Sequence, residues 1–333
     1  MWNRPGRRRA RPVKVVLPVT LCVSAVVALV VSLAVRPPES HAAPAAERYV
    51  DIAAVPRAPA PATGPGASTG SFTVDCGRNE EDHYNADNVV VSPGVTSGAH
   101  HVHDYVGNLS TNAFSTNASL AAAPTTCAGG DRSTYYWPVL RRLDRTGADA
   151  EDVGGGLDGN TGEILHASSV RVEFRGNPLS DVIAMPRFLR LVTGDPVAAT
   201  TDDLLVRAQW GCSGHPGRFS TRYALCPEDS GPTRTLDFPS CWNGLDTDSY
   251  NHRTHVQFPT ADGVCPHATF PIPQLRITLT YDLPHGTPFA VDSFPEQSRD
   301  PRTDHGMFVN VMTDRRMAEL VRCINEGRPC RSE

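Results

Sequence analysis

The sequence predicts a mainly β fold, a disulfide-stapled β-sandwich or jelly-roll-like domain with many irregular loops and one C-terminal helix. Three observations lead to this prediction. Several short stretches alternate apolar and polar side chains, as half-buried strands do. Most of the 29 prolines and 27 glycines fall between these stretches, where they act as turns. Eight of the nine cysteines follow the apolar N-terminal segment, and an even number suits disulfide pairing.

Four segments carry the strand pattern most clearly. Residues 169–176 and 275–283 alternate apolar with charged or polar side chains over their whole length. Residues 187–194 and 204–212 are β-type runs that end in turn residues. We expect these segments to be strands of the sandwich.

One segment, residues 313–327, carries a helical pattern. Thr313 suits the N-cap position, and Gly327 can end a helix in the left-handed conformation. We expect this helix to pack on the sheet through an apolar stripe at Met317, Leu320, Val321 and Ile324.

The N-terminal region predicts export. Residues 1–14 are rich in arginine and hold no acid, and residues 15–35 hold no charge. About 20 apolar residues cross a bilayer as a helix, and a basic flank stays on the cytoplasmic side. We therefore expect a basic cytoplasmic tail over 1–14. For 15–35 two alternatives stand: a transmembrane signal-anchor that binds the membrane, or a signal peptide cleaved near "SHA", residues 40–42, which resembles the small-residue cleavage pattern.

The rest of the chain divides by composition. Residues 36–70 are rich in alanine, proline and glycine, and such a segment buries too little apolar surface to offset its ordering entropy. We expect a disordered linker there, followed by one extracytoplasmic domain over 71–333. The protein is therefore predicted to be membrane-anchored by a single N-terminal helix or secreted.

The cysteines agree with an oxidising compartment, because no pair has the C-x-x-C spacing of a zinc cluster. Eight cysteines allow about 105 pairings. Proximity along the chain favours Cys76–Cys127, Cys212–Cys226, Cys241–Cys265 and Cys323–Cys330.

The charge of the exported part limits its partners. Residues 40–333 hold 24 basic and 35 acidic residues, a net charge of −11. This balance argues against nucleic acid as a partner. It does not oppose binding of a neutral cell-wall polysaccharide or of a cation.

Three histidines gather in "GAHHVHDYVGN", residues 98–108. His101 and His103 leave the same face of an extended chain, roughly 6.6 Å apart along it, and can bind one divalent metal such as zinc. A third ligand must come from elsewhere, and His255 and His305 are the candidates because each lies in a polar stretch beside an apolar strand. The alternative is structural, since buried imidazoles often bond to loop backbone.

Catalytic groups are less clearly marked. There is no G-x-S-x-G or Walker motif, which argues against an α/β-hydrolase and a nucleotide enzyme. Asp104 and Asp304, each beside a candidate ligand, are the candidate bases for a metal-activated water. The tryptophans that could stack on sugars, or lie in the core, are Trp137, Trp210 and Trp242.

Several longer stretches carry a family resemblance, among them "VVSPGVTSGAHHVHDYVGN", "STYYWPVL", "FPSCWNGLDTDSYNHRTHVQFP" and "CPHATFPIPQL". Together they resemble domain-of-unknown-function family nineteen-ninety-six, whose exported members have no assigned activity. The family's histidine pattern falls on His101, His103, His252, His255 and His305. This chain departs from that pattern at Met307, where members of the family commonly have an aspartate.

Two functions follow as hypotheses. One is an exported domain with a histidine-rich divalent-metal site; as an enzyme it would be a hydrolase acting on a cell-envelope or extracellular polymer. The other is a non-catalytic cell-surface module that binds polysaccharide or a protein partner, in which the histidines are structural and exposed tryptophans carry the affinity.

Overall fold

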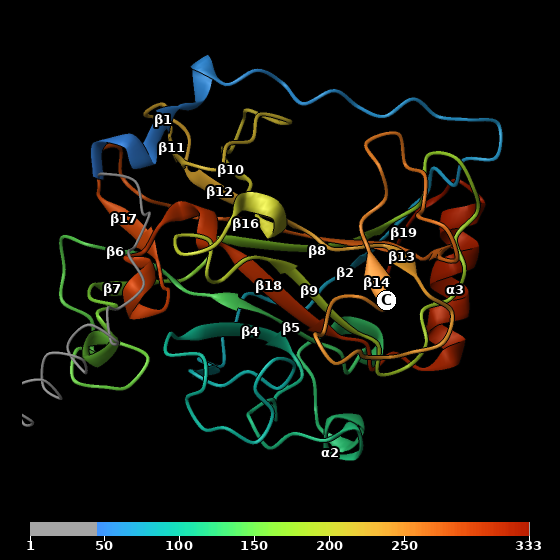
Figure 1. Cartoon of the computed structure of the whole chain (residues 1–333), viewed down its shortest axis with the longest axis horizontal. Coiled ribbons are helices and arrows are strands. Elements are labelled where there is room, and N and C mark those ends of the chain that lie inside the picture. The colour runs from blue at the N-terminus through green and yellow to red at the C-terminus, as the bar shows by residue number, and fades with distance from the viewer. Residues whose placement is uncertain (1–44, 333) are drawn as a thin grey trace, which may run out of the picture. The chain divides into compact units, whose positions relative to one another are not determined.

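Two antiparallel sheets face each other across the main hydrophobic core (Figure 1). The structure is a computed structural model and describes residues 45–332. The six-stranded sheet has the order β10 (Trp210–Cys212), β12 (Pro232–Asp237), β16 (Gln274–Thr280), β8 (Ser169–Arg175), β2 (Ser71–Val74) and β19 (Pro329–Arg331). Its strands pair antiparallel except at one edge, where β19 runs parallel to β2.

The five-stranded sheet has the order β3 (Tyr84–Asn85), β4 (His103–Gly107), β5 (Thr134–Pro138), β18 (His305–Val309) and β9 (Arg190–Gly194). All of its pairs are antiparallel. Its central strand, β5, separates two strands that are about 200 residues apart in the sequence, β4 and β18. The site described below depends on this arrangement.

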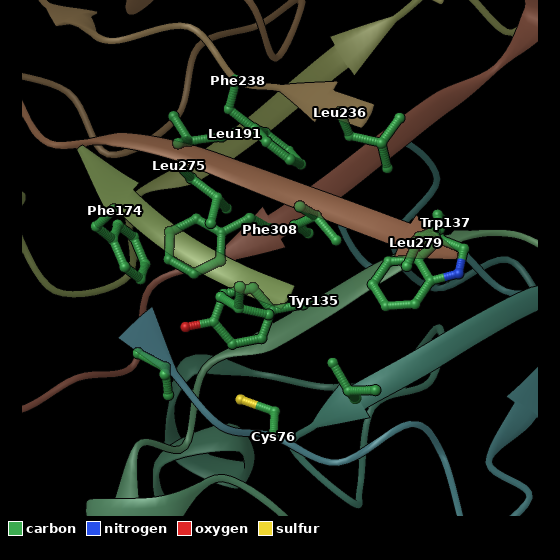
Figure 2. Close-up of a cluster of buried hydrophobic side chains, with 14 of the residues drawn as sticks. Cys76, Tyr135, Trp137, Phe174, Leu191, Leu236, Phe238, Leu275, Leu279 and Phe308 are labelled. Carbon is green, nitrogen blue, oxygen red and sulfur yellow. The ribbon is translucent and has the colours of Figure 1, made fainter. Parts of the chain in front are cut away.

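The main core lies between the two sheets and confirms the alternating pattern. In β8 and β16 the alternate residues Val172, Phe174, Leu275 and Ile277 are buried, and they meet side chains of the other sheet. Figure 2 shows Phe174 and Leu275 of one sheet close to Tyr135, Leu191 and Phe308 of the other. The predicted β-sandwich is therefore present, stapled by disulfides and rich in loops.

The opposite face of the five-stranded sheet is also covered. A second apolar cluster there comprises Val89, Val90, Tyr105, Leu120, Tyr136, Val192, Met307, Val309 and Val311. Part of its cover is α2 (Asn117–Ala122), which begins with a capping box between Thr116 and Ser119. Consequently β4, β5 and β18 are buried on both faces.

The C-terminal helix is α3 (Asp314–Asn325), close to the predicted bounds. The Thr313 side chain caps it by accepting from Arg316 N, and Gly327 follows with φ +69°. Its buried face comprises Met317, Leu320, Cys323 and Ile324. The prediction of one helix was incomplete, because α2 is also helical; with six residues α2 is too short to show a helical period.

Smaller elements complete the described chain. Three small sheets are β17 (Phe289–Val291), β6 (Leu140–Arg142) and β7 (Glu163–Leu165); β14 (Val256–Gln257), β13 (Cys241–Trp242) and β15 (Phe270–Pro271); and β1 (Tyr49–Asp51) with β11 (Tyr223–Leu225). The short 3-10 helices are η1 (Ala45–Arg48), η2 (Ile52–Ala54), η3 (Ala128–Gly130), η4 (Gly156–Asp158), η5 (Asp203–Leu205), η6 (Pro295–Gln297) and η7 (Pro301–Thr303).

The predicted strand over 204–212 is only partly present. Its last three residues form β10, whereas Leu204 and Leu205 belong to η5 and are exposed. The reason is local: the Asp202 side chain accepts from Leu204 N and starts a helical turn.

The segment for which a disordered linker is expected is described from residue 45 onward, and much of it contacts the domain. β1 pairs parallel with β11, and the side chain of Ile52 is fully buried. The Tyr49 hydroxyl donates to Phe289 O at 2.8 Å. The disorder prediction overlooked that Tyr49 and Ile52 supply the apolar surface that orders their neighbours.

The N-terminal predictions lie outside the described residues. These are the basic tail over 1–14, the apolar segment over 15–35 and the first part of the linker, 36–44. Among the residues described, no helix combines the length and the apolar character that crossing a membrane requires.

Four disulfides link the pairs that proximity favours, and all four predicted pairings are confirmed. They are Cys76–Cys127, Cys212–Cys226, Cys241–Cys265 and Cys323–Cys330. This set indicates an oxidising compartment, where such bonds form and persist.

Candidate metal centre

Three histidines meet on the outer face of the five-stranded sheet, the face that carries the second apolar cluster and points away from the six-stranded sheet. His101 Nε2 lies 3.1 Å from His103 Nε2 and 3.2 Å from His305 Nε2. His103 starts β4 and His305 starts β18, the two strands that flank β5. Both share the face of Tyr105 and Met307, because residues two apart on a strand point the same way. His101 reaches the same point from the segment that leads into β4.

The three imidazoles are buried and uncharged. Each side chain is almost wholly inaccessible, and rings surround the group: Phe294 packs edge-on against His101, and Tyr136 against His103. Burial lowers the pKa of His103 and of His305 to about 3. Burial, reinforced by the two neighbouring histidines, holds the pKa of His101 well below its ordinary value. All three rings are therefore neutral at pH 7.

Backbone carbonyls determine which ring nitrogens carry protons. His103 Nδ1 lies 2.8 Å from Asp87 O, and His305 Nδ1 lies 2.7 Å from Thr303 O. A carbonyl oxygen only accepts, so both Nδ1 atoms carry the hydrogen and both Nε2 atoms carry a lone pair. Metal-ligating histidines are oriented in this way in proteins, with the second nitrogen bonded to a carbonyl or carboxylate.

The three imidazoles cannot satisfy one another's hydrogen-bonding groups. His101 Nε2 faces two lone pairs, and one N–H can donate fully to only one of them. With the proton on Nδ1 instead, beside the Ala99 backbone, all three Nε2 lone pairs face one another. A cation between the rings removes this conflict.

The spacing fits a first-row divalent metal. Nitrogens about 2.0–2.1 Å from a tetrahedral zinc ion lie about 3.3–3.4 Å from each other. The observed Nε2 separations of 3.1 and 3.2 Å are close to that value. Three imidazoles form a ligand set that zinc, copper, iron and nickel accept.

A small cavity of about 120 Å³ adjoins the cluster, and His101 and His305 line it. Phe294 and Met307 also line it. Other lining residues lie nearer the surface, among them Asn251 and Val91, and Val91 is 48% exposed. The cavity has room for a water molecule or a small substrate group in a fourth coordination position.

The fourth predicted ligand, His255, lies outside this cluster. Its Nε2 is 2.7 Å from Arg190 O, and its Nδ1 is 3.0 Å from Ser249 Oγ. Both nitrogens are therefore occupied by structural hydrogen bonds, and His255 is not among the three converging histidines.

The two predicted bases also lie away from the cluster. Asp104 follows His103 on β4, so its side chain points to the opposite face, where Asn79 Nδ2 donates to it at 2.9 Å. Asp304 is fully buried and forms a two-bond ion pair with Arg234, at 2.5 and 3.2 Å. Neither lines the cavity beside the histidines. The Asp104 prediction overlooked that neighbouring residues of a strand point to opposite sides. Asp304 lies between η7 and β18, and its ion pair with Arg234 holds it away from the cavity.

Two further residues line the cavity: His252, which belongs to the family's histidine pattern, and Arg253, which no sequence pattern singled out. His252 Nδ1 is 2.9 Å from Asp248 Oδ1, and Arg253 Nη2 donates to Gly194 O at 2.8 Å. A signal for His252 exists in the sequence, since an acid four residues earlier can orient an imidazole.

Cys76, Cys127 and Asp131 form another group with metal-ligand atoms close together among the described residues. Its two sulfurs are joined in a disulfide, so they do not act as thiolate ligands. The histidine cluster is therefore the candidate that remains.

The comparison with known families bears directly on this region. A family described as "Domain of unknown function (DUF1996)" matches residues 88–311, which is more than half of the chain. The chain belongs to the DUF1996 family. This matched region contains His101, His103 and His305, so the whole cluster lies inside the DUF1996 domain. No curated protein and no solved structure matches the chain.

Proposed function

We propose that the DUF1996 domain of this protein binds one divalent cation, with zinc the best fit, through His101, His103 and His305. One observation carries the proposal: three neutral imidazoles direct Nε2 atoms at a common point. Carbonyl oxygens of Asp87 and Thr303 hold two of them in the tautomer that a metal needs.

The site has the form of a catalytic centre rather than a structural one. Structural zinc sites usually have four protein ligands, whereas catalytic sites have three and leave a position for water or substrate. Here three histidines adjoin a cavity of about 120 Å³. A cation in this position lowers the pKa of a bound water and polarises a carbonyl or phosphoryl oxygen. We therefore propose a hydrolase that acts on an envelope or extracellular polymer.

The proposed site of action is outside the cytoplasm. The four disulfides support an oxidising compartment. We propose that residues 15–35 carry the domain there, either as a retained membrane helix or as a cleaved signal.

The competing polysaccharide-binding module has less support. It relied on exposed tryptophans, but Trp137 and Trp210 are fully buried in the main core. Trp242 packs partly against that core, and its Nε1 donates to Asp246 O at 2.7 Å. These side chains stabilise the fold, so the metal site is the stronger basis for function.

Metal analysis of the purified protein tests the proposal. Protein prepared without chelators, then incubated with zinc and desalted, should hold about one zinc per chain. His101→Gln and His305→Gln should each lower the zinc content severalfold, because two imidazoles remain where three are needed. A wild-type protein that holds no zinc, or variants that hold as much as wild type, would refute the proposal.

His255→Gln is the matched control, because it changes a buried histidine of the same region that lies outside the cluster. It should keep the wild-type zinc content. Circular dichroism of each variant establishes that loss of metal does not result from unfolding.

A further inference from the structure

We infer that His252, oriented by Asp248, is the proton acceptor for a water molecule bound to the cation, so that the site is a metal-dependent hydrolytic centre. This inference rests on the proposed function, because it requires the cation. It adds a chemical role to a histidine that lies outside the cluster, in the loop between β13 and β14.

The first support is position. His252 lines the same cavity as His101 and His305, and that cavity measures only about 120 Å³. A water molecule coordinated in this space therefore shares a small cavity with His252. His252 belongs to the loop between β13 and β14, whereas His305 belongs to β18, so two separate elements contribute a histidine to the cavity wall.

The second support is the state of the His252 ring. Its Nδ1 lies 2.9 and 3.1 Å from the two carboxylate oxygens of Asp248. The carboxylate accepts this hydrogen bond, so Nδ1 carries the hydrogen and Nε2 is the ring nitrogen available as an acceptor. Within residues 45–332 this ring forms its hydrogen bonds to Asp248 through Nδ1. A histidine oriented by a carboxylate, with its other nitrogen available, is the usual form of a general base.

The third support is the anchoring of the loop. His252 has a left-handed backbone, φ +56°, a conformation that costs energy outside glycine. The loop is held by His255, which bonds Ser249 within it and Arg190 O on β9. The Cys241–Cys265 disulfide links β13, at the start of this loop, to the chain that follows β14. These bonds keep the His252 ring at the cavity.

Arg253 adds a positive charge to the same cavity wall. One of its nitrogens, Nη2, is engaged by Gly194 O, which leaves other guanidinium donors on the side chain. Positive charge beside a developing oxyanion lowers the energy of the transition state of acyl or phosphoryl transfer. The wall therefore suits a substrate whose reacting carbonyl or phosphoryl oxygen becomes negative.

The proposed step is a proton transfer followed by nucleophilic attack. An O–H bond of the coordinated water breaks, its proton forms an N–H bond with His252 Nε2, and the electron pair stays on the hydroxide. Asp248 stabilises the resulting imidazolium. The hydroxide then attacks the ester carbonyl, the bond to the leaving alkoxide breaks, and His252 returns the proton to the leaving group or to solvent.

Hydrolysis of p-nitrophenyl acetate by the zinc-loaded protein tests this inference. The wild type should release p-nitrophenolate above the rate of the zinc-free protein. His252→Ala should lower the rate about 100-fold, which is within the usual contribution of general base catalysis. Added imidazole should restore much of that loss, whereas a purely structural role for His252 would not be rescued. Asp248→Asn should cause a smaller loss, about tenfold.

His267→Gln is the control, because His267 is an exposed histidine outside the site and should leave the rate unchanged. Zinc content is measured for every variant. An unchanged rate in His252→Ala, or a loss that imidazole does not restore, would each overturn the role of His252 while leaving the proposed function intact. Zinc-loaded wild type that does not hydrolyse the ester would contradict the hydrolase of the proposed function as well. Absence of zinc in wild type would instead refute the proposed function.

Discussion

Asp304 and His305 are neighbours in the chain and belong to two very different polar regions. Asp304 lies on the inner side of the five-stranded sheet, where Arg234 donates two hydrogen bonds to it. Arg234 also bonds Pro138 O and the Tyr281 hydroxyl, and it stacks over Trp210. His305 lies on the outer face, where the nitrogens of three histidines face one another without enough protons to bond them.

The difference separates a stabilising cluster from a binding site. In the inner pair, Arg234 and Asp304 each have an oppositely charged partner in hydrogen-bond contact, so this pair has no free donor or acceptor directed at a ligand. On the outer face the lone pairs converge on a point beside a cavity. Burial alone therefore does not identify a functional group; unsatisfied donors or acceptors aimed at one point do.

Breaking the inner ion pair should give the largest loss of stability. Arg234→Met leaves Asp304 buried without its counter-charge, and we expect the free energy of unfolding to fall by about 3–5 kcal/mol. Denaturant unfolding followed by circular dichroism measures this change. The double variant Arg234→Met/Asp304→Leu should recover most of it, since both charges are then absent. At temperatures where Arg234→Met is folded, it should still bind one zinc ion, which would keep the two regions functionally separate.

The three-histidine cluster on the outer face should stabilise the protein only when zinc is bound. Free zinc at 100–1,000 times its dissociation constant should stabilise the wild type by about 2.7–4.1 kcal/mol. His101→Gln should show little of this gain. Without metal the same substitution should change stability by less than about 1 kcal/mol, because the three rings do not bond one another fully. A large loss of stability in the metal-free variant would mean that the cluster is structural after all.

A smaller, pH-dependent effect should come from Asp104 on the inner side. Burial raises the pKa of Asp104 to about 7, so the folded protein holds this proton more tightly than the unfolded chain. The contribution of Asp104 to stability is therefore full below about pH 4 and is lost as pH rises towards 7. Asp104→Asn lacks this titration and should be more stable than wild type at pH 8 by on the order of 2 kcal/mol. The difference should vanish at pH 4 in paired unfolding curves; equal stability at both pH values would contradict the prediction.

Sequence patterns identified the sheet that is half exposed better than the sheet that carries the site. β8 and β16 alternate buried with less buried residues, and their alternation predicted both. In β5 and β18 every residue is buried, so no period of two is visible there. A strand covered on both faces loses its alternating signal.

The sequence predicts the two ligands that lie close together in the chain, but the third ligand depends on the order of the strands in the sheet. His101 and His103 follow from their spacing, since residues two apart share a face. His255 and His305 look equivalent in sequence, because each lies in a polar stretch beside an apolar run. What distinguishes them is that β18 pairs with β5, next to β4, while His255 is bonded to Arg190 O. Such long-range pairing is not encoded in any local pattern.

The route by which the ligands are brought together has a consequence for how the centre would be filled. His101 and His305 are 204 residues apart, and they meet only when β5 has paired with both of its neighbours. In the unfolded chain the three histidines are therefore not assembled into a cation-binding site. The ion would have to be taken up after folding, from the same surroundings in which the four cross-links are oxidised.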